Sequence, residues 1–200
     1  MKKFFMIAAM MVAALTVNAQ NEVGQISIQP KIGMNLSSLR GDDDAKMMIG
    51  LAGGLEAEYG VAENFGIAVG ALYSMQGAKA KFPQVGTLKF HVDYINVPIV
   101  AQYYPVKGLA IKAGAQFGFN VRSKVSDGDD DMKIEDFFHA LGAKDMKQKS
   151  LDISIPVGVS YEISNIVIDA RYNFGLTKIW DPYKDKNSVF QLTVGYKFGL

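Results

Sequence analysis

Apolar and polar residues alternate along most of the chain, and residues 188–200 show this pattern most strictly. One face of this stretch carries Phe190, Leu192, Val194, Tyr196, Phe198 and Leu200. The residues between them are polar or glycine. A period of two is typical of a β-strand with one apolar and one polar face, so this stretch predicts a C-terminal strand that closes a sheet.

Seven earlier segments repeat the alternation, and their apolar faces contain no charged side chain. These faces span Ile26–Leu36, Ile49–Tyr59, Phe65–Met75, Ile95–Tyr103, Leu109–Val121, Leu151–Tyr161 and Ile166–Leu176. Segments of this length can cross a bilayer as tilted strands. A soluble, lipocalin-like barrel with its apolar face inside would show the same alternation, so the pattern alone leaves both folds open.

The connections between the segments favour the membrane fold. Those after the second, fourth and sixth segments are short (60–64, 105–108 and 163–165), whereas the others are longer and polar. Aromatic residues gather near both ends of the segments, as in the two aromatic girdles of outer-membrane barrels. We therefore predict an all-β fold, an eight-stranded antiparallel up-and-down transmembrane β-barrel with short periplasmic turns and long external loops.

The N-terminal residues differ from the rest. Lys2 and Lys3 precede an apolar run over residues 4–17, and Val17-Asn18-Ala19 matches a small-residue cleavage site. The run is too short for a membrane helix. This pattern predicts a cleaved signal peptide over residues 1–19 and an outer-membrane barrel domain over residues 20–200.

We expect the protein to be cut after Ala19 and to fractionate with the outer membrane, because export and cleavage follow from this leader. Intact-mass measurement of the purified protein should give a chain that begins at Gln20. A chain that begins at Met1, or recovery in the soluble periplasm, would contradict this prediction.

Composition limits the possible functions. Loss of Lys2 and Lys3 lowers Lys+Arg from 21 to 19 against 20 Asp+Glu, which leaves a net charge of −1 with His neutral. This balance provides no global basic excess for binding nucleic acid. The chain has no cysteine, so disulfides and thiolate metal sites are excluded. We expect no nucleic-acid partner, no metal and no cofactor.

Charged residues on the polar faces are balanced. Five acidic and five basic side chains are assigned to the inside of the barrel: Glu56, Glu58, Asp152, Glu162, Asp169, Lys31, Lys112, Arg122, Arg171 and Lys197. An eight-stranded barrel has an interior just wide enough for side chains to fill it. Buried charges are costly unless they are paired. We therefore predict a lumen filled by a charge network rather than an open pore.

Several short motifs follow one another along the chain. They are Lys31-Ile32-Gly33-Met34-Asn35, Leu72-Tyr73-Ser74 with Gly77, Asp93-Tyr94-Ile95-Asn96-Val97-Pro98, Gly114 with Gly118, Asp169-Ala170-Arg171-Tyr172 and Gly195-Tyr196-Lys197-Phe198. With these motifs, nearly the whole mature chain resembles the PorT-like outer-membrane β-barrel family of Bacteroidota. The resemblance implies a location in the cell outer membrane. Members of that family are mostly of unknown role, and a few are linked to protein secretion.

The two histidines are candidates for chemistry at the rim of the barrel. His91 shares a strand face with Asp93, and His139 lies in the third long loop. An imidazole base needs an orienting carboxylate and a nucleophile, and the chain has no nucleophile-elbow motif. We expect a solvated polar rim and no enzymatic activity, and a rim hydrolase or acyltransferase is the least favoured alternative.

Two acidic runs, 42–44 and 127–131, could suggest cation binding. Asp127, Asp129 and Asp131 match the start of a calcium loop, but Met132 and Phe138 occupy the positions of its glycine and glutamate. We expect solvated acidic loops rather than a calcium site.

The longest loop, residues 123–149, is the best candidate for a function at the cell surface. Ile134, Phe137, Phe138 and Leu141 have the spacing of the apolar side of a short helix. This side either forms a docking surface for another envelope or extracellular protein, or folds back over the barrel mouth. We favour a structural or interaction barrel in the lipid bilayer whose external loops bind a partner. The alternative is a transport module, either a narrow porin or a component of a protein-secretion machinery.

Overall fold

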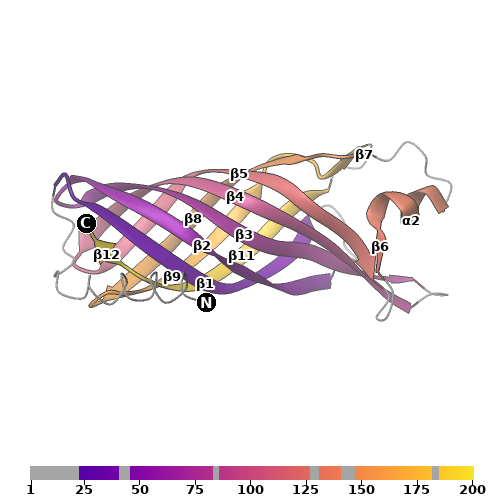
Figure 1. Ribbon diagram of the computed structural model, residues 1–200, viewed down its shortest axis with the longest axis horizontal. Coiled ribbons are helices and arrows are strands. Elements are labelled where there is room, and N and C mark those ends of the chain that lie inside the picture. The colour runs from indigo at the N-terminus through magenta and orange to yellow at the C-terminus, as the bar shows by residue number, and fades with distance from the viewer. Residues whose placement is uncertain (1–22, 41–45, 83–85, 127–130, 141–146, 182–184) are drawn as a thin grey trace, which may run out of the picture.

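A closed antiparallel β-barrel dominates the computed structural model (Figure 1). The structure describes residues 23–40, 46–82, 86–126, 131–140, 147–181 and 185–200. The barrel strands are β1 (Ile26–Arg40), β2 (Lys46–Ala62), β3 (Phe65–Phe82), β4 (Gly86–Val106), β5 (Leu109–Ser126), β8 (Leu151–Ile163), β9 (Ile166–Gly175) and β11 (Lys186–Tyr196). The shorter elements are β6 (Asp131–Lys133), α2 (Ile134–Ala140), β7 (Lys147–Gln148), β10 (Trp180–Asp181) and β12 (Phe198–Gly199).

The last strand closes the barrel, as the sequence predicts. β11 pairs antiparallel with β1, with Leu192 opposite Met34, and β12 continues this pairing with Phe198 opposite Ile28. The other edge of β11 pairs antiparallel with β9. Each barrel strand therefore has two neighbours, and the predicted fold of eight antiparallel strands is confirmed.

The two faces of the wall separate apolar from polar residues. Along β1, Ile28 and Ile32 face outward and are exposed, whereas Gln29 and Lys31 face inward and are buried. The same alternation continues around the barrel, with an exposed apolar exterior and a buried polar interior. This arrangement matches a lipid-facing surface around a polar lumen and excludes the soluble barrel with an apolar interior.

Short turns lie at one end of the barrel. Residues 63–64, 107–108 and 164–165 join β2 to β3, β4 to β5 and β8 to β9. Gly108 has φ of 81°, a conformation that glycine adopts without steric cost. The predicted short turns are thus present, and each is a tight hairpin connection.

Strands β3 and β4 extend well beyond the predicted segments. The sequence places a long loop between Met75 and Ile95, but β3 continues to Phe82 and β4 begins at Gly86. In this extension the alternation inverts: Phe90 and Val92 are buried inside, while Lys89 is exposed outside. Beyond the membrane the outer face meets water, so apolar residues move inward while the backbone pairing continues. The predicted segments were defined by apolar residues on the outward face, so they end where this inversion begins.

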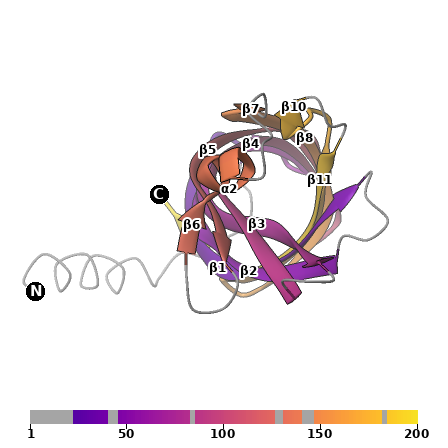
Figure 2. The same cartoon turned by 90° about the vertical axis from the view of Figure 1, so that its right-hand side faces the viewer.

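The inward apolar residues of the extension form a hydrophobic core at the external end, which we call the outer core. It consists of Leu88, Phe90, Val92, Tyr94, Val125, Ile134, Ile179 and Trp180, with Leu39 and Phe137 packed against it. These residues come from β1, β4, β5, α2 and the segment around β10. Figure 2 looks into this end and shows α2 projecting over the opening, with β7 and β10 at its rim. No helix in the described part of the chain is long and apolar enough to cross a membrane.

Candidate functional site

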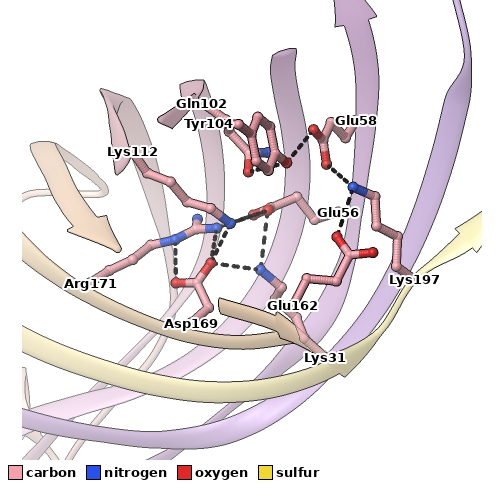
Figure 3. Close-up of polar contacts among 10 residues, drawn as sticks. All are labelled: Lys31, Glu56, Glu58, Gln102, Tyr104, Lys112, Glu162, Asp169, Arg171 and Lys197. Carbon is pink, nitrogen blue, oxygen red and sulfur yellow. Dashed lines mark hydrogen bonds and ion pairs between the residues drawn. The ribbon is translucent and has the colours of Figure 1, made fainter. Parts of the chain in front are cut away.

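The lumen contains a central cluster of five charged side chains from β1, β2, β5 and β9 (Figure 3). Asp169 lies at its centre. One carboxylate oxygen of Asp169 accepts hydrogen bonds from Lys112 Nζ at 2.7 Å, Arg171 Nη2 at 2.7 Å and Lys31 Nζ at 3.4 Å. Arg171 Nε donates to the other oxygen at 2.8 Å. A single carboxylate therefore contacts three cations.

Glu56 completes the central cluster from the β2 side. Arg171 Nη2 lies 2.8 Å from each of its carboxylate oxygens, and Lys31 Nζ lies 3.1 Å from one of them. Lys112 Nζ is 3.9 Å away. All five side chains are at most 2% exposed. Because these charges are removed from water, each depends on its partners for stabilisation.

A second cluster lies beside the first. Lys197 Nζ contacts Glu58 at 3.0 Å and Glu162 at 3.3 Å, and the Tyr104 hydroxyl donates to Glu58 at 2.6 Å. A cavity of about 10 Å³ adjoins the second cluster, and its lining includes Glu58, Glu162 and Lys197 of that cluster and Lys112 of the first. That volume holds about one water molecule. The two clusters together contain four acids and four bases, so their formal charges balance.

Asp152 belongs to neither cluster. Its carboxylate accepts hydrogen bonds from Thr177 Oγ1 at 2.7 Å and from Asn187 Nδ2 at 3.0 Å. Asn187 Nδ2 also lies 3.4 Å from the hydroxyl of Tyr94, a member of the outer core. The carboxylate is thus held by neutral donors below the outer core.

Arg122 is the one predicted lumen charge that the structure places on the outside. The pairing of β4 with β5 shifts at Val121, so Asp93 pairs with Arg122 whereas Tyr94 pairs with Asn120. The extra residue of this β-bulge moves every later side chain of β5 to the opposite face. The Arg122 side chain is 47% exposed and lies 3.8 Å from Asp93. The assignment of Arg122 to the lumen is therefore wrong.

The bulge also determines the environment of the candidate rim residues. The Asp93 carboxylate is fully buried and accepts a hydrogen bond from the Tyr73 hydroxyl at 2.7 Å. Arg122 provides its opposite charge. This carboxylate is therefore engaged by Tyr73 and Arg122 instead of orienting His91. His139 lies exposed in the last turn of α2.

The predicted docking surface is largely used within the protein. Ile134 is 2% exposed and belongs to the outer core, and the Phe137 ring packs edge-on against Phe90 at 6.1 Å between centroids. The side chain of Phe138, together with Leu141 and the acidic runs at 42–44 and 127–130, lies outside the described residues. Ile134 and Phe137 thus pack onto the outer core, and the docking surface as a whole stays a prediction.

Two features of the site were missed by the sequence reasoning. Tyr104 joins the second cluster, and the inverted alternation over residues 88–94 forms much of the outer core. Nothing in the sequence around Tyr104 indicates that this aromatic residue takes part in a charge cluster. The inversion does carry one, because Leu88, Phe90 and Val92 alternate with Lys89 and His91 in the sequence itself.

Comparisons with known proteins agree with this architecture. The profile of the family described as "Outer membrane protein beta-barrel domain" matches residues 18–181. The attachment invasion locus protein Ail of Yersinia pestis has a similar structure, with 18% identity over 88% of this chain and 100% of that chain and a TM-score of 0.52. Neisserial surface protein A (NspA) is also similar, with 18% identity over 86% of this chain and 96% of that chain and a TM-score of 0.50.

A further structure of Ail, in complex with the heparin analogue sucrose octasulfate, has 17% identity over 88% of this chain and 100% of that chain and a TM-score of 0.52. A search of curated proteins found no match to the chain. At these identities the structural similarities establish the fold alone.

Proposed function

The chain belongs to the outer membrane protein beta-barrel domain family, and on that premise we propose that it is a structural or interaction barrel whose function lies on its external surface. Its location is the cell outer membrane, where its exterior is embedded in the lipid bilayer. The observation that carries the proposal is the closed lumen.

The lumen is obstructed at two levels by different chemistry. The charge clusters bring side chains from β1, β2, β5 and β9 together across the interior, with contacts of 2.7–3.4 Å to Asp169. Towards the external end, the outer core fills the interior with apolar side chains. A solute would have to separate buried ion pairs and then cross an apolar barrier. These obstacles favour an interaction role over a narrow porin.

We expect the wild-type protein to show no stable conductance in planar lipid bilayers, because both obstructions are parts of the folded barrel. Recordings at several voltages, after insertion from detergent, measure this directly. A preparation of a porin recorded in the same bilayers provides the positive control. Large, long-lived channels formed by the wild-type protein would contradict the proposal and favour the transport module.

Two finer assignments belong to the same proposal. The sequence motifs support a PorT-like member of the family, and such an assignment would favour association with a protein-secretion machinery. We also propose that the protein is not an enzyme, since Asp93 is held by Tyr73 and Arg122 and is not paired with His91.

A partner at the 123–149 loop would contact solvent-facing residues such as Glu135 and Asp136 rather than Ile134. Pull-down of bound proteins from native membranes tests whether the barrel has such a partner.

A further inference from the structure

The pairing of β2 with β3 is interrupted towards the external end of the barrel. The register shifts here, so residues 48–51 of β2 face residues 75–77 of β3 without regular pairing. Gly50 permits close approach of the two backbones, because a Cβ atom at this position would lie 2.2 Å from the carbonyl oxygen of Met75. Backbone groups in such an interruption need partners other than the neighbouring strand.

Asn35 of β1 provides some of these partners. Its Nδ2 atom lies 2.9 Å from Ser74 Oγ, 3.0 Å from the carbonyl oxygen of Met75 and 3.4 Å from that of Leu51. The amide nitrogen carries only two hydrogens, so it cannot satisfy all three oxygens. Gln76 Nε2 also donates to Ser74 Oγ, at 2.9 Å. Two amide groups therefore meet at one hydroxyl oxygen.

Ser37 of β1 is shared between oxygens in the same way. Its hydroxyl oxygen lies 2.8 Å from the carbonyl oxygen of Gly77 and 3.3 Å from that of Met48, although a hydroxyl group has one hydrogen. The Gly77 N–H donates to this hydroxyl at 3.0 Å. Asn35 and Ser37 thus offer three hydrogens to five oxygens.

Two further buried oxygens in this region have no hydrogen-bond donor among the described residues. They are Asn35 Oδ1 and Gln76 Oε1, and these residues are 0% and 2% exposed. The contacts of Asn35 fix the orientation of its amide, because the reverse orientation would place its oxygen against two carbonyl oxygens. We define the break site as the side chains of Asn35, Ser37, Ser74 and Gln76 with the carbonyl oxygens of residues 48, 51, 75 and 77. It is rich in oxygen and poor in hydrogen.

The charge of the lumen also favours a cation. Of the nine predicted charges that lie in the lumen, five are acidic and four are basic. The two clusters are balanced, so Asp152, which is held by Thr177 and Asn187, is the excess acid. One further positive charge in the lumen would make these charges balance.

We propose that the break site binds a monovalent alkali cation, Na⁺ or K⁺. Carbonyl oxygens can replace the hydration shell of such an ion. The ion attracts every oxygen of the site, whereas one water molecule supplies only two hydrogens. A divalent ion is disfavoured because the ligands in the described part of the chain are all neutral. The ion is enclosed when the barrel folds, and its binding does not depend on what the external surface contacts.

The test compares the stability of the whole barrel, refolded into lipid vesicles, in NaCl, KCl and choline chloride of equal ionic strength. Choline is too large to enter the site and serves as the reference cation. We expect a higher urea midpoint of unfolding in NaCl or KCl, because an ion that binds only the folded state stabilises it. The shift should grow with the alkali concentration. Equal midpoints in the three salts would overturn the proposal.

Gln76→Met removes one of the two oxygens without a donor and keeps an unbranched side chain. We expect the difference between the salts to be lost in this variant. Gln116→Met is the matched control, since Gln116 is also a buried lumen amide, 4% exposed, and contacts Ser154 at 3.2 Å. It should retain the wild-type difference. Each variant is compared with itself across the salts, and an equal response of both variants would overturn the assignment to the break site.

Crystals of the wild-type barrel grown with thallium(I) acetate locate the ion directly, because Tl⁺ replaces K⁺ and scatters anomalously. We expect an anomalous peak in contact with Asn35 Oδ1 and Gln76 Oε1. This measurement needs no variant, so it decides the question also where Gln76→Met fails to fold. An ordered water molecule at this position, without anomalous signal, would show a buried water only and would overturn the proposal.

Discussion

Asp169→Asn is expected to lower the free energy of unfolding by about 3–5 kcal/mol, the cost typical of breaking a buried ion pair. The substitution keeps the shape of the side chain and removes the carboxylate that contacts Lys31, Lys112 and Arg171. Three buried cations would then share the single charge of Glu56 in the central cluster. Urea titrations of the barrel in lipid vesicles measure the change.

A compensating substitution separates loss of charge balance from loss of packing. Asp169→Asn combined with Lys112→Met should be more stable than Asp169→Asn alone, because the second change removes one unbalanced cation. Asp152→Asn is the matched control: it is the same chemical change at a carboxylate held by Thr177 and Asn187. We expect it to cost less. Equal costs for both Asp→Asn variants would show that the central cluster has no special role in stability.

Val157→Arg is expected to lower the free energy of unfolding by about 2–4 kcal/mol, as for a cation at the bilayer midplane. Val157 faces outward from the middle of β8 and is 43% exposed to the surroundings. Ile163→Arg provides the matched control, since Ile163 also faces outward but ends the strand at a short turn. Near the interface the same substitution should cost about 0–1 kcal/mol. Equal costs at both positions would contradict the assigned depth of β8.

Gly158, which follows Val157, is not a suitable site for a mildly destabilising comparison variant. The alternation predicts that Gly158→Ser is milder than Val157→Arg, because residue 158 lies on the lumen side. In the structure, however, a Cβ atom at Gly158 would lie 2.3 Å from the carbonyl oxygen of Ala170. That oxygen belongs to the backbone of the neighbouring strand and cannot move aside easily. We therefore expect Gly158→Ser to be destabilising, although the position is not in contact with lipid.

The sequence by itself determined the architecture of the membrane-spanning part. Lipid outside and a narrow lumen inside impose opposite polarity on alternate residues, so each spanning strand carries its orientation in its own pattern. The same local signals predict the short turns, the aromatic residues near the strand ends and the C-terminal closing strand. Strands β1, β2 and β8 consequently include the predicted segments completely, and β9 ends one residue short of its segment. The last predicted segment is divided between β11 and β12.

Only the tertiary structure decided which charges meet and where the external end closes. Alternation assigns a residue to a face but gives no height, so it could not show that Asp169 contacts Lys31 and Lys112 from other strands. The bulge at Val121 reversed the face of Arg122 because one extra residue shifts the period of two. The outer core joins residues from β1, β4, β5, α2 and the segment around β10. Such contacts depend on how distant segments pack, and no local pattern specifies them.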